Sequence, residues 1–321
     1  MSVIVYIEIE NGLVKKSSQE AVFYGSEVAK MQGTTSIGLA IGEINEQELS
    51  MLGNFGISKV IHVNNPQLAQ INIMPYANVL SQVVEQTNSK FVIFSKSSSA
   101  DAIASRAAAK LKASIVTNAV ELPDFSNGTN IKRSIYTGKA FANVSLTADV
   151  KIIGIKKNAV SIVQTSEKAS VEKQDIALAE SNFTSKILST QKATGQISLP
   201  EADIVVSAGR GLKAPENWGI VEDLAKVLGA ATACSKPVSD LDWRPHHEHV
   251  GQTGIKVSPN LYIACGISGA IQHLAGVNSS KVIVVINTDP EAPFFKSADY
   301  GIVGDVFDVL PQLTKAVANL K

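Results

Sequence analysis

Residues 261–276 read LYIACGISGAIQHLAG, and this stretch decides the fold of the second half of the chain. Its first part, Leu261–Ala264, is a short apolar run typical of a buried strand that ends at Gly266. Ser268 and Gly269 then open a stretch with helical spacing. A strand that turns into a helix leaves free backbone amides and the positive end of the helix dipole at the turn. We therefore expect an anion to bind there, with the Ser268 hydroxyl as a further donor.

The kind of anion follows from what this turn lacks. It contains neither a GxGxxG fingerprint nor the GK[ST] that completes a phosphate-binding loop. A dinucleotide pyrophosphate therefore fits it better than a triphosphate with magnesium. His273 lies on the first turns of the predicted helix, where its ring could face either the ligand or the core.

The sequence on both sides of this stretch repeats the alternation of strand and helix. Strand Ala202–Ser207 and helix Asn217–Leu228 precede it, and strand Lys281–Asn287 and helix Val306–Leu320 follow it. Such alternation is typical of a largely parallel sheet flanked by helices. We expect a doubly wound ligand-binding domain of about 120 residues, over 201–321.

Two further segments lie at carboxyl ends of predicted strands, which is where open α/β sheets bind ligands. Gly209 and Gly211 allow a tight turn, and Arg210 between them offers a planar fork suited to phosphate; a plain surface turn is the alternative. After the strand at 281–287, the side chains of Asn287 and Asp305 could hold ribose hydroxyls or an adenine edge. The prolines between them also fit turn chemistry alone.

The loop VGQTG, residues 250–254, places Gln252 and Thr253 between two glycines. It can bring a hydroxyl and backbone amides against a flat ligand. The run His246-His247-Glu248-His249 just before it has a spacing that could suit a metal, but it follows Pro245 in a predicted loop, and no second ligand pair is found. A solvated loop is the alternative that we favour.

The first half of the chain also alternates strands and helices. Apolar runs predict strands at Ser2–Glu8, Thr35–Ile41, Lys59–Val63 and Lys90–Ser95, with helices at Glu20–Gln32, Met74–Gln86 and Asp101–Lys112. After Ser114 the segments are β-prone, including Ala159–Val163. We expect an α/β domain over 1–165. Residues 166–200 are polar and without a firm period, which predicts a linker.

Composition narrows the class of protein. The 29 basic and 29 acidic residues balance, which argues against nucleic acid or a membrane surface as the main partner. No targeting segment is found, apolar runs are too short to span a bilayer, and only two cysteines occur, so we expect a cytoplasmic protein. Neither GxSxG nor HExxH nor a Cys–His nucleophile signature is found, which indicates a cofactor holder without its own acid–base chemistry.

Four motifs in order, AGRGLK, VGQTG, LYIACGISGAIQHLAG and INTDPEAPFFKSADYGIVGD, resemble the carboxyl-terminal domain of electron-transfer flavoprotein alpha subunits. The likeness is close from about Ala202 to the end. Before Gln164 it is looser, although IKRSIYTGKA resembles a family segment. The resemblance implies two α/β domains, of which the first packs on a partner subunit and the second is a doubly wound FAD-binding domain.

The resemblance also implies a set of cofactor contacts. Arg210 and Ser235 would touch FAD, the Thr253 hydroxyl would lie near flavin N5, and Lys236 stands where many members have an arginine stacked on the flavin. The complete set is Arg210, Ser235, Lys236, Val250, Gly251, Gln252, Thr253, Ser268, Gly269, Ala270, Ile271, Gln272, His273, Asn287, Asp305 and Val306.

The family implies an electron carrier without substrate turnover of its own. Its expected partner is a beta subunit that holds AMP, and the pair would take electrons from flavin dehydrogenases such as the acyl-CoA dehydrogenases of fatty acid beta-oxidation. It would pass them to a quinone oxidoreductase or another acceptor. Two alternatives remain from the sequence: a nicotinamide-binding oxidoreductase domain, and an assembly subunit that has lost its cofactor. The intact glycine segments count against the second.

Overall fold

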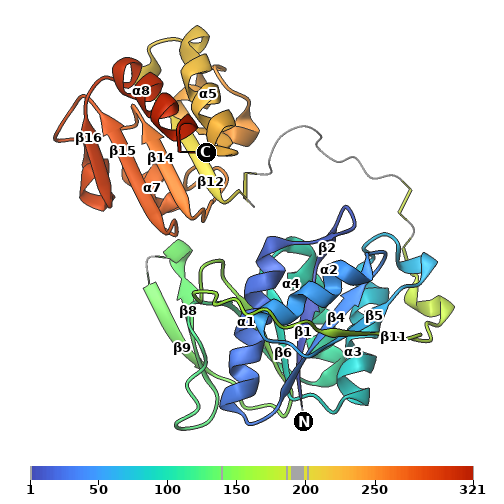
Figure 1. Ribbon diagram of the computed structural model, residues 1–321. Coiled ribbons are helices and arrows are strands. Elements are labelled where there is room, and N and C mark those ends of the chain that lie inside the picture. The colour runs from blue at the N-terminus through green and yellow to red at the C-terminus, as the bar shows by residue number, and fades with distance from the viewer. Residues whose placement is uncertain (1, 139, 186, 189–198, 201, 321) are drawn as a thin grey trace. The chain divides into compact units, whose positions relative to one another are not determined.

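The computed structural model describes residues 2–138, 140–185, 187–188, 199–200 and 202–320 of the chain. The chain divides into two compact units, Met1–Gln191 and Lys192–Lys321. Each is an α/β structure built on a sheet that is wholly or largely parallel, as the sequence predicts (Figure 1). Within the described residues, none of the helices combines the length and hydropathy that a membrane span requires.

The first unit contains a nine-stranded sheet in the order β11-β5-β4-β1-β6-β10-β7-β8-β9. All neighbours are parallel except at β8 and β9, which form an antiparallel hairpin at one edge. All six residues of β1 are buried, because helices cover both faces of the sheet. The strands are β1 (Ser2–Ile7), β4 (Thr35–Ile41), β5 (Lys59–Val63), β6 (Phe91–Ser95), β7 (Ser114–Ala119), β8 (Asn130–Ile135), β9 (Ala140–Ser145), β10 (Lys151–Ile155) and β11 (Ser170–Lys173).

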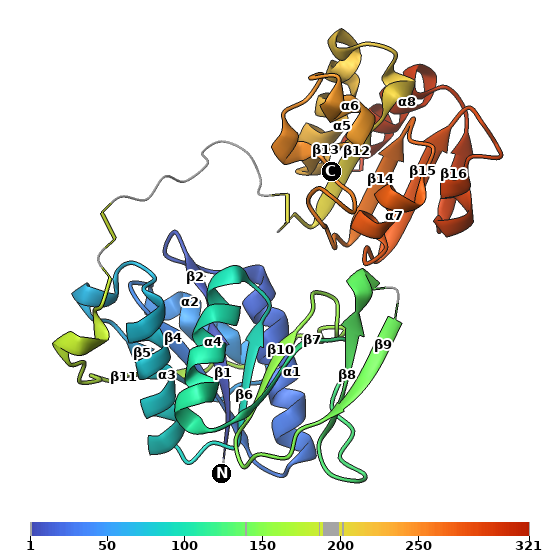
Figure 2. The same cartoon turned by 180° about the vertical axis from the view of Figure 1, so that it is seen from behind.

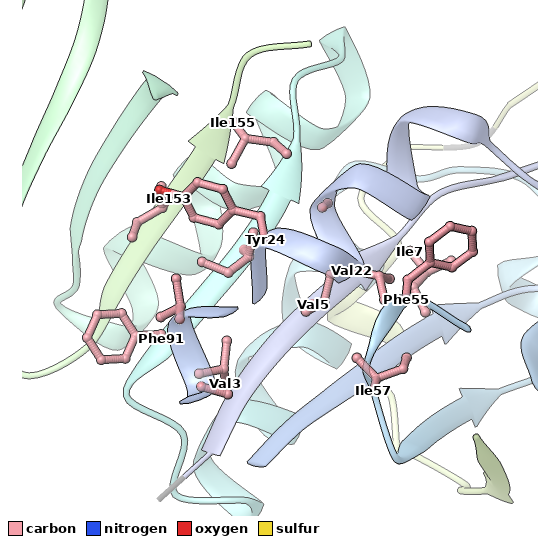
Figure 3. Close-up of a cluster of buried hydrophobic side chains, with 14 of the residues drawn as sticks. Val3, Val5, Ile7, Val22, Tyr24, Phe55, Ile57, Phe91, Ile153 and Ile155 are labelled. Atoms are coloured by element: carbon pink, nitrogen blue, oxygen red, sulfur yellow. The ribbon is translucent and has the colours of Figure 1, made fainter. Parts of the chain in front are cut away.

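The two faces of β1 belong to two separate hydrophobic clusters. Val3, Val5 and Ile7 pack with α1 (Lys16–Met31), as Figure 3 shows, and the alternate residues pack with α3 (Ile73–Gln86) and α4 (Ser98–Leu111). Figures 1 and 2 show these helices from opposite sides of the sheet. A short helix, α2 (Glu46–Ser50), follows β4. The alternation of buried residues in β1 thus joins both layers of the unit.

The linker was expected over 166–200, but the beginning of this range belongs to the first unit. Residues 170–173 form β11, which pairs in parallel with β5, and Ala169 and Ile176 beside it are buried. The strand has only one half-buried position, so its sequence carries no apolar period that would reveal it. Residue 186 and residues 189–198 of the expected linker lie outside the described residues. The β-prone stretch 159–163 forms no strand, which corrects that expectation.

The second unit contains five parallel strands in the order β13-β12-β14-β15-β16. On one face lie α5 (Gly219–Leu228) and α8 (Val306–Ala318), and on the other lies α7 (Ile271–Val277) (Figure 2). A short helix, α6 (Lys236–Asp240), follows β13. The strands are β12 (Ile204–Ala208), β13 (Ala231–Cys234), β14 (Leu261–Cys265), β15 (Val282–Asn287) and β16 (Tyr300–Val303).

This strand order creates one topological switch point in the second unit. The chain moves from β12 outward to β13, then returns to the other side of β12 and continues through β14, β15 and β16. Connections on the two sides of β12 therefore leave in opposite directions, which opens a crevice outside the carboxyl ends of β12 and β14. The candidate site lies at this crevice.

Candidate functional site

Glycines bring the loops that follow β12 and β14 into backbone contact. The amide of Gly209 donates to the oxygen of Cys265 at 2.9 Å, and that of Gly211 donates to the oxygen of Gly266 at 3.2 Å. A Cβ on Gly209 would stand 2.4 Å from the Gly266 oxygen, and Gly266 itself has a φ of +61°. Only glycine fits these positions without displacing the other loop. The switch point thus presents bare backbone, with the exposed side chain of Arg210 beside it.

The turn after β14 departs in one respect from the prediction. Helix α7 begins at Ile271, not at Ser268, and it is only seven residues long. Gly269, with a φ of +81°, packs so closely on Phe294 that a Cβ would come within 2.3 Å of its Cβ. This contact directs residues 266–270 across the sheet edge before the helix starts. The side chains of Ser268, Ala270, Ile271 and Gln272 are exposed there.

The loop at 250–254 packs on the start of α7. The amide of Gln252 donates to the oxygen of Gln272 at 2.7 Å, and the amide of Val250 donates to the oxygen of Cys234 at 3.0 Å. A Cβ on Gly276 would lie 2.6 Å from the nitrogen of Gly251, so the two backbones touch. The loop therefore joins the end of β13 to α7, with the side chains of Gln252 and Thr253 exposed.

The end of β13 completes this side of the edge. The amide of Ser235 donates to the oxygen of Ala208 at 3.1 Å, and Ser235 is buried as the residue before α6. Lys236 is the first residue of α6 and is exposed. The segments after β12, β13 and β14 are thus linked to one another by backbone hydrogen bonds, although they are separated in sequence.

The ring of His273 lies in the core. It is only 7% exposed, its Nε2 lies 2.9 Å from the Tyr262 hydroxyl, and its ring meets Phe294 edge-on at 5.7 Å. Its Nδ1 is buried without a hydrogen bond of good geometry. Burial, and then the neighbouring His249, lower the pKa of His273 to about 4, so the ring is neutral at pH 7. The sequence left open whether this ring faces the ligand or the core. Its contacts are those of a ring packed in the core, with Nδ1 as the nitrogen that lacks a partner.

The segment after β15 contributes polar groups at the far side of the crevice. Asn287 donates from Nδ2 to the oxygen of Ile267 at 3.0 Å, which ties this strand end to the turn after β14. Asp305 caps α8 by accepting from the amide of Phe307 at 3.1 Å, and that hydrogen bond lowers its pKa. Lys213 lies 3.5 Å from the same carboxylate. The side chain of Val306, the first residue of α8, is buried, so only its backbone could reach a ligand.

The structure therefore gathers the predicted residues at one edge but does not expose all of them. The exposed side chains are Arg210, Lys236, Gln252, Thr253, Ser268, Ala270, Ile271 and Gln272, and Asn287 and Asp305 are half-buried. Sequence reasoning gave no role to Gly266, although this residue joins two of the segments. The positive φ of Gly266 is a property of the folded turn that the sequence only hints at through its glycine.

Glu248 in the histidine run is engaged elsewhere. It is 3% exposed and accepts from Arg244 at 2.7 and 2.9 Å, in a two-point ion pair. This bond raises the pKa of Arg244 and holds the turn in a fixed shape. Among the residues that the structure describes, no three His, Cys, Asp or Glu side chains are grouped as metal ligands.

The first unit has a switch point of its own, between β1 and β6, but a protein carboxylate fills it. Glu8, 2% exposed, accepts from the hydroxyls of Ser97 at 2.6 Å and Ser99 at 3.0 Å, at the start of α4. Ser97 also caps that helix through the amide of Ala100. A carboxyl group of the chain itself therefore lies where a sheet of this kind would bind a phosphate. The second unit is the one with an open edge.

Two family models match separate parts of the chain. The electron transfer flavoprotein domain matches residues 3–179, and the electron transfer flavoprotein FAD-binding domain matches residues 198–278. Electron transfer flavoprotein subunit alpha of Bacillus subtilis (strain 168) is 38% identical over 99% of this chain and 98% of its own. That of Thermoanaerobacterium thermosaccharolyticum is 34% identical over the same shares, and the mitochondrial subunit of Oryza sativa subsp. japonica is 35% identical over 100% and 92%. The chain belongs to the electron transfer flavoprotein alpha-subunit family.

Proposed function

We propose that this chain binds FAD at the carboxyl edge of its second unit and, paired with a beta subunit, carries electrons between other enzymes. The observation that carries the proposal is the meeting of Gly209, Gly211 and Gly266 at the switch point between β12 and β14. Bare backbone at a switch point accepts a large phosphorylated ligand. We take 201–321 as the FAD-binding domain.

The residues present fit FAD. Glycines remove the Cβ atoms that would hold a pyrophosphate away from the backbone, and the exposed Arg210 and Ser268 supply a charge and a hydroxyl. Asn287 and Asp305 offer amide and carboxylate oxygens for the adenosine end. FAD supplies a ring that accepts and gives up electrons, a chemistry that amino-acid side chains do not provide.

The protein's own groups then bind and orient the ring. Gln252 and Thr253 project from a loop that backbone hydrogen bonds fix to α7 and β13. Lys236 adds a positive charge at the same edge, which favours a negatively charged reduced cofactor. The orphan Nδ1 of the buried His273 is one polar atom that a ligand could satisfy.

The buried titratable groups support a carrier and not an enzyme that turns over a substrate. His273 is neutral and enclosed, and burial raises the pKa values of Cys234 and Cys265 to about 12, so both thiols are poor nucleophiles. Glu248 is bound to Arg244. These groups can hold a cofactor in place but are poorly suited to acid–base or covalent chemistry on a substrate.

The partners follow from the same proposal. They are a beta subunit that holds AMP, acyl-CoA dehydrogenases of beta-oxidation as donors, and a quinone oxidoreductase as acceptor. We place the chain itself in the cytoplasm. The test is to co-purify the chain with its beta subunit and to add an acyl-CoA dehydrogenase with its acyl-CoA. We expect the absorbance of the oxidised flavin to bleach only when the two-subunit complex, the dehydrogenase and the acyl-CoA are all present. It should recover when a quinone oxidoreductase and quinone are added. A flavoprotein that stays oxidised with every acyl-CoA dehydrogenase supplied would refute the assigned donors.

A further inference from the structure

The loop at 250–254 is wrapped around the ring of His249. This residue is 2% exposed, and its backbone oxygen accepts from the amide of Ile255 at 2.8 Å, which closes the loop at its base. A Cβ on Gly254 would stand 2.8 Å from the ring Nδ1, and a Cβ on Gly251 would stand 3.3 Å from Nε2. Both glycines thus leave the space that the imidazole fills.

The turn before His249 is fixed independently of the loop. Glu248 holds Arg244 with two hydrogen bonds, and Arg244 also donates to Glu222 at 2.9 Å and lies over the ring of Trp218 at 5.4 Å. Glu248, which directly precedes His249, is therefore anchored through Arg244 to α5 and to the core beneath it. His249 is held from one side by this anchor and from the other by the loop.

The surroundings of the His249 ring disfavour its protonated form. Its Nδ1 is buried with no hydrogen-bond partner. The charged or titratable groups that face it are His246 of the same turn, with ring centroids 5.6 Å apart, Lys236 and Asp240 of α6, and His273 of α7. Only Asp240 among them favours a positive ring; burial first, and then His246, lower the pKa of His249. His249 and His273 also disfavour each other's protonation.

We infer that His249 is the positioning residue of the ligand loop: its neutral ring supports residues 250–254 from inside, holds Gln252 and Thr253 at the sheet edge, and releases the loop when it takes up a proton. This inference rests on the proposed FAD site. It assigns no contact between His249 and the cofactor, because the ring is buried and packs on the glycines of the loop. The effect on binding is therefore transmitted through the loop.

The test measures the dissociation constant of FAD from the chain in complex with its beta subunit, by flavin fluorescence, at pH 8 and pH 5. His249→Leu fills the space without a polar atom, His249→Gln keeps a neutral polar group that cannot titrate, and His247→Gln changes an exposed histidine of the same turn. We expect His249→Leu to weaken binding about tenfold at pH 8, because a branched aliphatic side chain does not reproduce the flat ring on which Gly251 and Gly254 pack. His249→Gln should bind within about threefold of the unmodified chain at that pH.

The pH profile separates positioning from packing. From pH 8 to pH 5 the unmodified chain and His247→Gln should both lose FAD affinity by about tenfold, and His249→Gln by no more than about threefold. A pH response of His249→Gln equal to that of His247→Gln would overturn the inference, even if His249→Leu failed to fold. An unmodified complex without FAD affinity at either pH would instead overturn the proposed function.

Discussion

Acidification should weaken the second unit through His273, and the structure gives the size of the effect. The ring is 7% exposed and bound to Tyr262, and its pKa falls from the ordinary 6.5 to about 4 on folding. Between these two pH values the His273 ring is therefore protonated in the unfolded chain but neutral in the folded unit. Since the folded pKa is the lower one, the contribution of this ring is complete above pH 6.5 and is lost as the pH falls toward 4.

Each pH unit in that interval costs about 1.4 kcal/mol, so acidification from pH 6.5 to 4 should lower the free energy of unfolding by about 3 kcal/mol through His273 alone. His273→Gln removes the titration but keeps a polar group toward Tyr262. At pH 8 we expect this variant to be less stable by about 1 kcal/mol, because one hydrogen bond is disturbed. Its smaller loss in acid should then make the two stability curves cross between pH 6.5 and 4.

Tryptophan fluorescence isolates the relevant unit without a label. The chain has two tryptophans, Trp218 and Trp243, and both lie in the second unit. Urea unfolding of the cofactor-free chain, followed by tryptophan emission at half-unit steps from pH 8 to 4, gives the free energy of unfolding of that unit. Parallel curves for the unmodified chain and His273→Gln would refute the buried, neutral assignment of this ring.

Three further outcomes test other parts of the structure. Gly209→Ala should destabilise the second unit by about 2 kcal/mol in the same urea assay, because its Cβ would collide with Gly266. The control Gly219→Ala, whose Cβ meets nothing within 4 Å, should change the free energy of unfolding by less than about 0.5 kcal/mol. Equal effects would argue against the close loop contact. Glu248→Gln should cost about 3 kcal/mol, because it leaves the half-buried Arg244 without its buried carboxylate partner. Glu222→Gln, whose side chain is 52% exposed, should cost less than about 1 kcal/mol. The reverse order in urea unfolding would contradict the anchor. Lys236→Ala should lower the midpoint potential of the bound flavin by about 20–40 mV while Lys236→Arg preserves it, by spectroelectrochemical titration; an unchanged or higher potential for the alanine variant would place Lys236 away from the flavin.

The sequence predicted the edge of the sheet at which the candidate residues gather. Leu261–Cys265 and residues 282–286 are continuous apolar runs followed by glycine or turn residues, so their carboxyl ends could be located from local pattern alone. Because parallel strands end at the same edge, residues as far apart as Arg210 and Asn287 could be placed together before the structure was known.

Other features depend on long-range contacts that no local pattern records. Nothing near His273 in sequence shows that its ring meets Tyr262, eleven residues earlier on β14. Strand β11 is almost entirely polar at the sheet edge and is held by backbone pairing with β5, so its residues resemble a linker. His249 stands in a run that looks solvated, and only the folded loop around it reveals its burial.

In the proposed site the second unit holds FAD at the edge between β12 and β14, while the Glu8 carboxyl lies at the corresponding edge of the first unit. The most direct measurement is the number of FAD molecules per chain, from the absorbance of flavin released on denaturing the complex with the beta subunit. We expect one FAD per full-length alpha chain beyond any that the beta subunit carries alone, and none on residues 1–188 with the same partner. One FAD retained by residues 1–188, or a full-length complex without any, would contradict it.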